Sequence, residues 1–186
     1  MKHALKCESL EIHLSDEWNA VKRSELRSAA GQFAGRDFSD LSALPHDETW
    51  SLSLTHCKSA GGFAAVKKPL RVGLDLEIAD RIEERVVRRV SSNEEVATAP
   101  NVSLLWVGKE ALFKSLREFD QPSVLGELRL LNWQKIEHPL TLEGKTIPAW
   151  FFNGERIKDR QQIPGRGVVI KINAFALSLF LSSSST

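Results

Sequence analysis

The sequence has few cysteines, no long apolar run and almost no net charge, and each of these shortages excludes a class of protein. Its 186 residues contain two cysteines, which cannot make a disulfide framework, so we expect a reduced, cytoplasmic setting. No apolar run approaches the roughly 20 residues that a membrane helix needs. The first residues also lack the apolar region of a signal peptide. A formal net charge of +1 provides no general basic field for nucleic acid.

The composition and the order of the patterns predict an α+β protein. With 42% hydrophobic and 26% charged residues, the chain suits one compact domain or two small fused halves. There is no short repeat, but strands and a long helix in residues 1–77 are followed by helices and strands in 78–186. We therefore expect two halves of similar content that form one compact unit.

The residue pattern of the first half predicts a helix between two groups of strands. Alternation predicts strands at 5–15 and 50–57, and a β-hairpin is expected at 61–77. The helix would begin after Ser15, as its N-cap, and stop at Gly35. Its basic side carries Lys22, Arg23 and Arg27, which are either ordinary solvated charges or ligands for phosphate.

The second half predicts two helical regions before a run of strands. Helices are expected at 79–90 and 104–119, the second one capped by Ser103, with a short helix capped by Ser91 or Ser92 between them. Alternation predicts the strands at 126–133, 147–153, 168–172 and 175–181.

The stretch 71–77 combines alternating apolar residues with two carboxylates. Because successive side chains of a strand face opposite sides, Asp75 and Glu77 lie on one face, about 7 Å apart. Like charges held side by side repel unless a cation lies between them, which favours a divalent metal. An edge strand with a solvated polar face would show the same pattern.

The predicted helix 104–119 supplies a third carboxylate. Glu110 lies between Trp106 and Phe113 on one row of the helix, and Lys114 follows one turn later. A solvated Glu–Lys pair would have this spacing too. A carboxylate flanked by aromatic rings is partly desolvated, however, and that disfavours its charge unless a cation compensates it. If the three carboxylates meet, they make an oxygen-rich Mg²⁺ site.

Taken together, these stretches resemble the 4′-phosphopantetheinyl transferase superfamily, whose signature is GxDxE followed by WxxKExxxK. The matching residues are Gly73, Asp75, Glu77, Trp106, Lys109, Glu110 and Lys114. Ser53–Cys57 is similar to the family's strand that ends in Ser-His-Ser, and Arg89–Glu95 is similar to its Arg-x-x-Ser-x-x-Glu segment. Lys58 replaces a usual glycine after the first of these segments.

The resemblance implies a fold and an activity. Members of the Sfp type have two pseudo-symmetric halves, each a small antiparallel sheet packed with a long helix, with the site at their interface; one chain then works as a monomer. They transfer the 4′-phosphopantetheine arm of coenzyme A to a serine of an acyl or peptidyl carrier protein, with Mg²⁺, as in holo-acyl-carrier-protein synthase. The product 3′,5′-ADP leaves.

The resemblance also assigns roles to residues. Asp75, Glu77 and Glu110 would bind the metal, and Glu77 could instead be the base for the attacking serine. Lys114 would contact a phosphate. The coenzyme would also be bound by His56, Thr55, Lys109, which faces the phosphates or the carrier, and Arg27.

Two other classes of protein fit the same residues. One is a different metal-dependent phosphoryl-transfer enzyme or nuclease built on three carboxylates. The other is a silent relative that binds a carrier without modifying it, although the presence of all four motif residues, Asp75, Glu77, Glu110 and Lys114, argues against silence.

Overall fold

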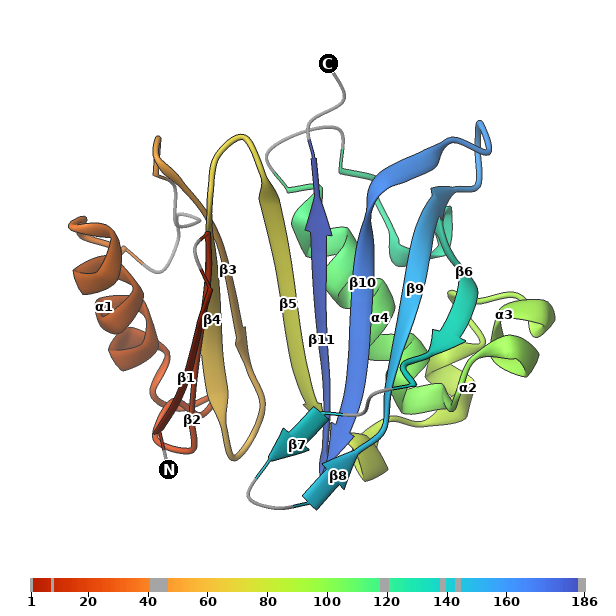
Figure 1. The fold of residues 1–186 in the computed structure, drawn as a ribbon, viewed down its shortest axis with the longest axis horizontal. Helices are drawn as coiled ribbons and strands as arrows, with labels where there is room; N and C mark the ends of the chain where they lie inside the picture. The colour runs from red at the N-terminus through yellow and green to blue at the C-terminus, as the bar shows by residue number, and fades with distance from the viewer. Residues whose placement is uncertain are drawn as a thin grey trace.

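The computed structural model describes residues 2–7, 9–40, 47–117, 121–137, 140–142 and 145–183, which form an α+β protein with two antiparallel sheets (Figure 1). The four-stranded sheet has, in order, β1 (Lys2–Cys7), β2 (Leu10–Ser15), β4 (Gly61–Lys67) and β3 (Trp50–His56). The five-stranded sheet has, in order, β5 (Arg71–Ile78), β11 (Phe175–Ser182), β10 (Gln162–Ile172), β9 (Ala149–Arg156) and β6 (Leu128–Lys135). A separate ribbon pairs β7 (Leu140–Leu142) with β8 (Lys145–Ile147).

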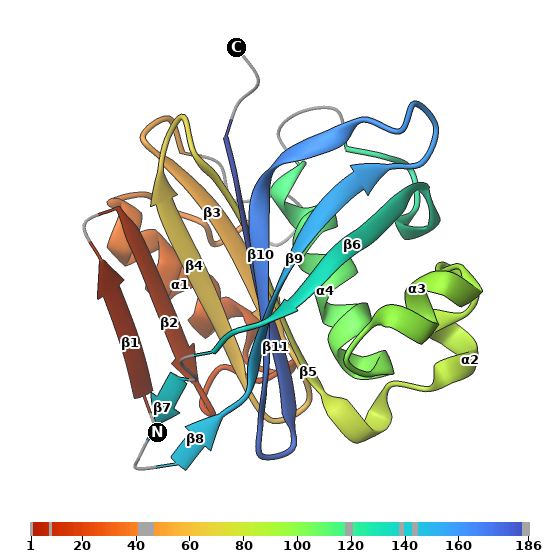
Figure 2. The same cartoon turned by 45° about the vertical axis from the view of Figure 1, so that its right-hand side comes forward.

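The helices cover the outer faces of the two sheets. They are α1 (Arg23–Ala34), α2 (Glu84–Val87), α3 (Asn93–Thr98) and α4 (Val102–Ser115), with the 3-10 turns η1 (Ala79–Arg81) and η2 (Leu125–Glu127). Helix α1 packs on the four-stranded sheet and α4 on the five-stranded sheet, so the two helices lie on opposite sides of the molecule (Figures 1 and 2). No helix in the described part of the chain has the length and apolar character needed to span a membrane.

The two sheets face each other through a shared apolar layer. Ala64 and Val66 of β4 pack there with Val72 and Leu74 of β5. The alternate residues of β4 instead face α1, which gives the four-stranded sheet two buried faces. The alternation predicted for 71–77 is confirmed, but the strand is not a solvated edge, because Asp75 is only 3% exposed.

Strands β3 and β5 are joined by side chains rather than by backbone pairing. The hydroxyls of Ser51, Ser53 and Thr55 accept hydrogen bonds from the backbone amides of β5, at 3.2, 2.9 and 3.0 Å. Their donors are Val72, Leu74 and Leu76, a constant 21 residues further along the chain. The hydroxyl row thus satisfies amides at the edge of the five-stranded sheet that would otherwise be buried without acceptors.

Gly73 allows α4 to lie directly on β5. A Cβ atom at this position would come within 1.7 Å of the carbonyl oxygen of Ala111 and within 2.7 Å of the amide of Ser115. Both neighbours are backbone atoms of α4, which cannot rotate away as a flexible side chain could. The glycine of the GxDxE pattern is therefore required by helix–strand contact.

Several predicted elements differ from the structure. The expected hairpin at 61–77 is wrong, since β4 and β5 belong to different sheets. The single strand predicted at 5–15 is the pair β1 and β2, and the helix predicted at 79–90 is η1 and α2, separated by extended Ile82 and Glu83. Ile82 packs against the core there, and this tertiary contact overrides helical periodicity.

The two long helices begin at places other than those predicted. Helix α1 starts at Arg23, because the Ser15 hydroxyl accepts from the amide of Glu17 and the Asn19 side chain from that of Val21, and such local bonds compete with a helix. The stop at Gly35, in the left-handed region with φ 66°, is confirmed. Helix α4 is capped by Asn101, and the predicted positions 118–119 lie outside the described residues.

Gly73→Ala is expected to lower the free energy of unfolding by about 3 kcal/mol or more, because a methyl group must push α4 off β5. Urea unfolding measures the loss. Gly126→Ala is the matched control, since a Cβ there meets no atom closer than 3.8 Å, and it should change stability by no more than about 0.5 kcal/mol. Equal stabilities of the two variants would contradict this account of Gly73.

Candidate functional site

Asp75 of β5 and Lys114 of α4 meet at the contact that Gly73 permits. The Lys114 ammonium lies 2.6 Å from Oδ1 of Asp75 and also donates to the carbonyl oxygen of Leu74 at 3.3 Å. The two side chains are 39 residues apart in sequence. The structure therefore brings together the two halves of the motif on which the sequence argument rested.

Thr55 holds the same carboxylate from the other sheet. Its hydroxyl donates to Oδ1 of Asp75 at 3.2 Å while it accepts from the Leu76 amide. The second oxygen of Asp75, Oδ2, is buried and has no hydrogen-bond partner among the described residues. A buried carboxylate oxygen without a donor is unfavourable, so this atom is a natural position for a bound cation.

Glu77 and Glu110 complete an acidic cluster around Asp75. Burial raises the pKa of Glu77 to about 7, and the charges of Asp75 and Glu110 raise it too, whereas Lys114 opposes them. Burial also raises the pKa of Glu110, followed by the charge of Asp75, again against Lys114. Three carboxylates and one lysine thus share one electrostatic environment.

The cluster fits a hard cation, although it is not a preformed metal cage. Within the described ranges, no three His, Cys, Asp or Glu side chains are already gathered closely enough to enclose a metal ion. The Lys114 ammonium neutralises Asp75 instead. The unpartnered oxygen of Asp75 and the raised pKa values of both glutamates are the features that a divalent cation would relieve. Carboxylate oxygens are also the ligands that Mg²⁺ prefers.

His56, at the end of β3, adds a neutral base beside the cluster. Burial lowers the pKa of His56; a hydrogen bond to its own backbone opposes this, and the charges of Arg23 and Lys114 lower the pKa further, against Asp75. The imidazole is therefore neutral at pH 7. Arg23 and Lys114 are the two cations whose charge acts on His56.

Arg27 has a different place from the one predicted. Its Nε donates to the carbonyl oxygen of Phe38 at 2.5 Å and its Nη2 to that of Asp40 at 2.6 Å. The guanidinium thus holds the segment after α1, which corrects its assignment as a coenzyme ligand. Arg23, one turn earlier, is exposed and is the charge that acts on His56. Both arginines are visible in the sequence, but the direction in which the helix turns each of them is not.

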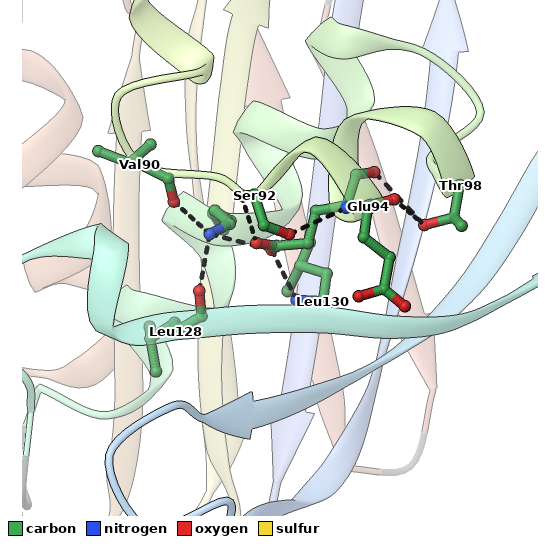
Figure 3. Close-up of polar contacts among 8 residues, drawn as sticks. Val90, Ser92, Glu94, Thr98, Leu128 and Leu130 are labelled. Carbon is green, nitrogen blue, oxygen red and sulfur yellow. Dashed lines mark hydrogen bonds and ion pairs between the residues drawn. The ribbon is translucent and has the colours of Figure 1, made fainter.

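Lys109 is also misplaced by the sequence argument, because it does not face the site. Its side chain is fully buried and its ammonium lies 3.0 Å from Oε1 of Glu95, with further bonds to the carbonyl oxygens of Val90 and Leu128 (Figure 3). Burial lowers the pKa of Lys109, and Glu95 opposes that shift. The prediction that Lys109 faces phosphates or a carrier is therefore corrected. The spacing of Glu95 three residues after Ser92 predicts only the capping box that the two residues form.

No known protein-family model matches the chain, and comparison with curated proteins finds no match either. The resemblance therefore rests on the motif residues alone.

Glu77→Gln is expected to stabilise the metal-free protein more at pH 8 than at pH 5. Because the folded pKa of Glu77, about 7, exceeds the ordinary value of 4.5, its contribution to stability is complete below pH 4.5 and is lost as the pH rises through 7. The amide cannot ionise, so the variant avoids this loss. Solvent screening limits the gain to the order of 1 kcal/mol.

Urea unfolding in EDTA at both pH values measures the difference. The control is Glu127→Gln, at an exposed position, which should show no such dependence. Equal gains at pH 5 and pH 8 would refute the raised pKa of Glu77.

Proposed function

We propose that this protein transfers the 4′-phosphopantetheine arm of coenzyme A to a serine of an acyl or peptidyl carrier protein, with Mg²⁺. The observation that carries the proposal is the meeting of Asp75 with Lys114 and Thr55, which come from three separate motifs. Glu77 and Glu110 share the electrostatic environment of Asp75. A chance match to three short motifs does not require their polar residues to converge.

We also propose the two-half fold of this superfamily, with halves 1–77 and 78–186. This proposal is supported by the helices, since α1 and α4 each cover one antiparallel sheet. Strand β5 then crosses from the first half into the sheet of the second. The site lies where β3 and β5 adjoin, within one chain, so we expect a monomer to be active.

The metal would be held by Asp75 and Glu110, with Oδ2 of Asp75 as the oxygen that lacks another partner, and Glu77 is left as the base. A magnesium ion there would supply positive charge to the pyrophosphate of the coenzyme.

The chain's own side chains then divide the remaining tasks. The serine oxygen of the carrier forms a bond to the β-phosphate as the bond from that phosphorus to the bridging oxygen breaks, and 3′,5′-ADP departs with that oxygen. Glu77 accepts the serine proton, since it is the carboxylate of the cluster left off the metal and its burial favours the protonated form. Lys114 donates to a phosphate oxygen, and Arg23 and neutral His56 bind the phosphate of the ribose.

Asp75→Asn should reduce transfer at least about 100-fold, because the amide cannot replace a charged metal ligand in phosphoryl transfer. Intact-mass spectrometry of an apo acyl carrier protein, with coenzyme A and Mg²⁺, measures the added arm, and EDTA should abolish it. Asp80→Asn, just beyond the same strand and exposed, is the matched control. Full transfer by folded Asp75→Asn would refute the metal assignment.

Arg23→Ala should raise the KM for coenzyme A about tenfold, the loss of one charge-assisted contact. Arg27→Ala should instead lower the melting temperature, because the carbonyl oxygens of Phe38 and Asp40 lose their donor. Steady-state kinetics and thermal unfolding of both variants separate the roles. A raised KM in Arg27→Ala alone would restore the sequence-based assignment.

A further inference from the structure

Glu95 and Lys109 form a buried ion pair in which both carboxylate oxygens and the ammonium have hydrogen-bond partners. Oε2 of Glu95 accepts from the Ser92 amide at 3.0 Å, and Oε1 accepts from the Leu130 amide at 3.1 Å. Lys109 has three ammonium protons and three acceptors, namely Oε1 of Glu95 and the carbonyl oxygens of Val90 and Leu128 (Figure 3). Glu95 is 2% exposed and Lys109 is 0% exposed.

The pair joins α4 to three other parts of the chain. Lys109 belongs to α4, Glu95 to α3, Val90 to the segment between α2 and α3, and Leu128 to β6. An ammonium whose three bonds point to fixed backbone and carboxylate oxygens resists a large rotation of its helix. The pair therefore ties the Lys109 side of α4 to these three parts.

The adjacent residue of α4 is Glu110. Consecutive residues of an α-helix lie about 100° apart around its axis, so the direction of Lys109 determines that of Glu110. On the opposite side, α4 touches β5 at Gly73, and Lys114 of α4 bonds to Asp75 and Leu74 of that strand. The ion pair of Lys109 holds the other side of the helix.

We propose that the Lys109–Glu95 ion pair is a positioning device that keeps Glu110 directed at Asp75. A buried ion pair is a weak source of stability, since apolar replacements of similar volume are often neutral or stabilising. Its value here is geometric. The inference concerns how α4 is held, and its role in metal binding rests on the proposed function.

The test is the double variant Lys109→Met/Glu95→Gln, which removes both charges and nearly conserves volume. We expect it to fold, with Mg²⁺ affinity by titration calorimetry about tenfold or more weaker than in the unaltered protein, as is typical when a partner of a metal ligand is lost. The control is Arg36→Met/Asp47→Asn, which removes an ion pair between the segment after α1 and the segment before β3 and should leave Mg²⁺ affinity unchanged.

A second readout needs no metal. Nuclear Overhauser contacts between the Gly73 α-protons and the Ser115 amide report the seating of α4 on β5. They should weaken in the double variant and persist in the control. A folded double variant with unchanged contacts and unchanged Mg²⁺ affinity would overturn the proposal. Changed contacts in a protein that binds no Mg²⁺ would support positioning while refuting the proposed function.

Lys109→Arg keeps the charge, and it replaces the double variant in both measurements if that variant does not fold. A planar guanidinium cannot reproduce three ammonium bonds in place, so Mg²⁺ affinity and the α4–β5 contacts should again weaken. Retention of both in this variant would also overturn the proposal.

Discussion

The row of hydroxyls on β3 is the interaction on which the arrangement of the site depends. Ser51, Ser53 and Thr55 satisfy alternate amides of β5 and fix the register between the two sheets. Thr55 does more than its neighbours, since the same hydroxyl also donates to Asp75. The register of the sheets and the orientation of the central carboxylate are thus set by one row of small side chains.

The face of β5 that packs against α4 has a different requirement. There a side chain must be absent, because the backbone of α4 occupies the space next to Gly73. This close approach brings Glu110 and Lys114 to Asp75, but it concentrates three carboxylates near one lysine. Burial then raises the pKa of Glu77 and of Glu110, which is the electrostatic tension typical of functional sites.

Sequence reasoning succeeded where a local period fixed the direction of a side chain. The alternation of 71–77 placed Asp75 and Glu77 on one face of a strand, and the four-residue spacing placed Lys114 beside Glu110. It failed where direction depended on distant packing. Lys109 is hydrophilic and lies in a functional motif, yet α3 and β6 enclose it completely. No periodicity shows that Glu95 will reach it.

Local patterns also could not predict which sheet a strand joins. Two strands separated by a short polar turn favour a hairpin, but β5 instead pairs with β11, about a hundred residues later in the chain. The same applies to Arg23 and Arg27, one turn apart on α1. Their roles are distinguished only by the segment after α1, whose carbonyl oxygens Arg27 binds.

The ion pair of Lys114 with Asp75 also affects how the protein folds in the absence of a ligand. Because Lys114 of the same chain neutralises Asp75, this carboxylate needs no metal to become buried during folding. Small zinc domains, by contrast, are unfolded without their metal. If the proposed function holds, folding of this protein is therefore separable from the supply of the ion, and a shortage of the ion would leave folded protein.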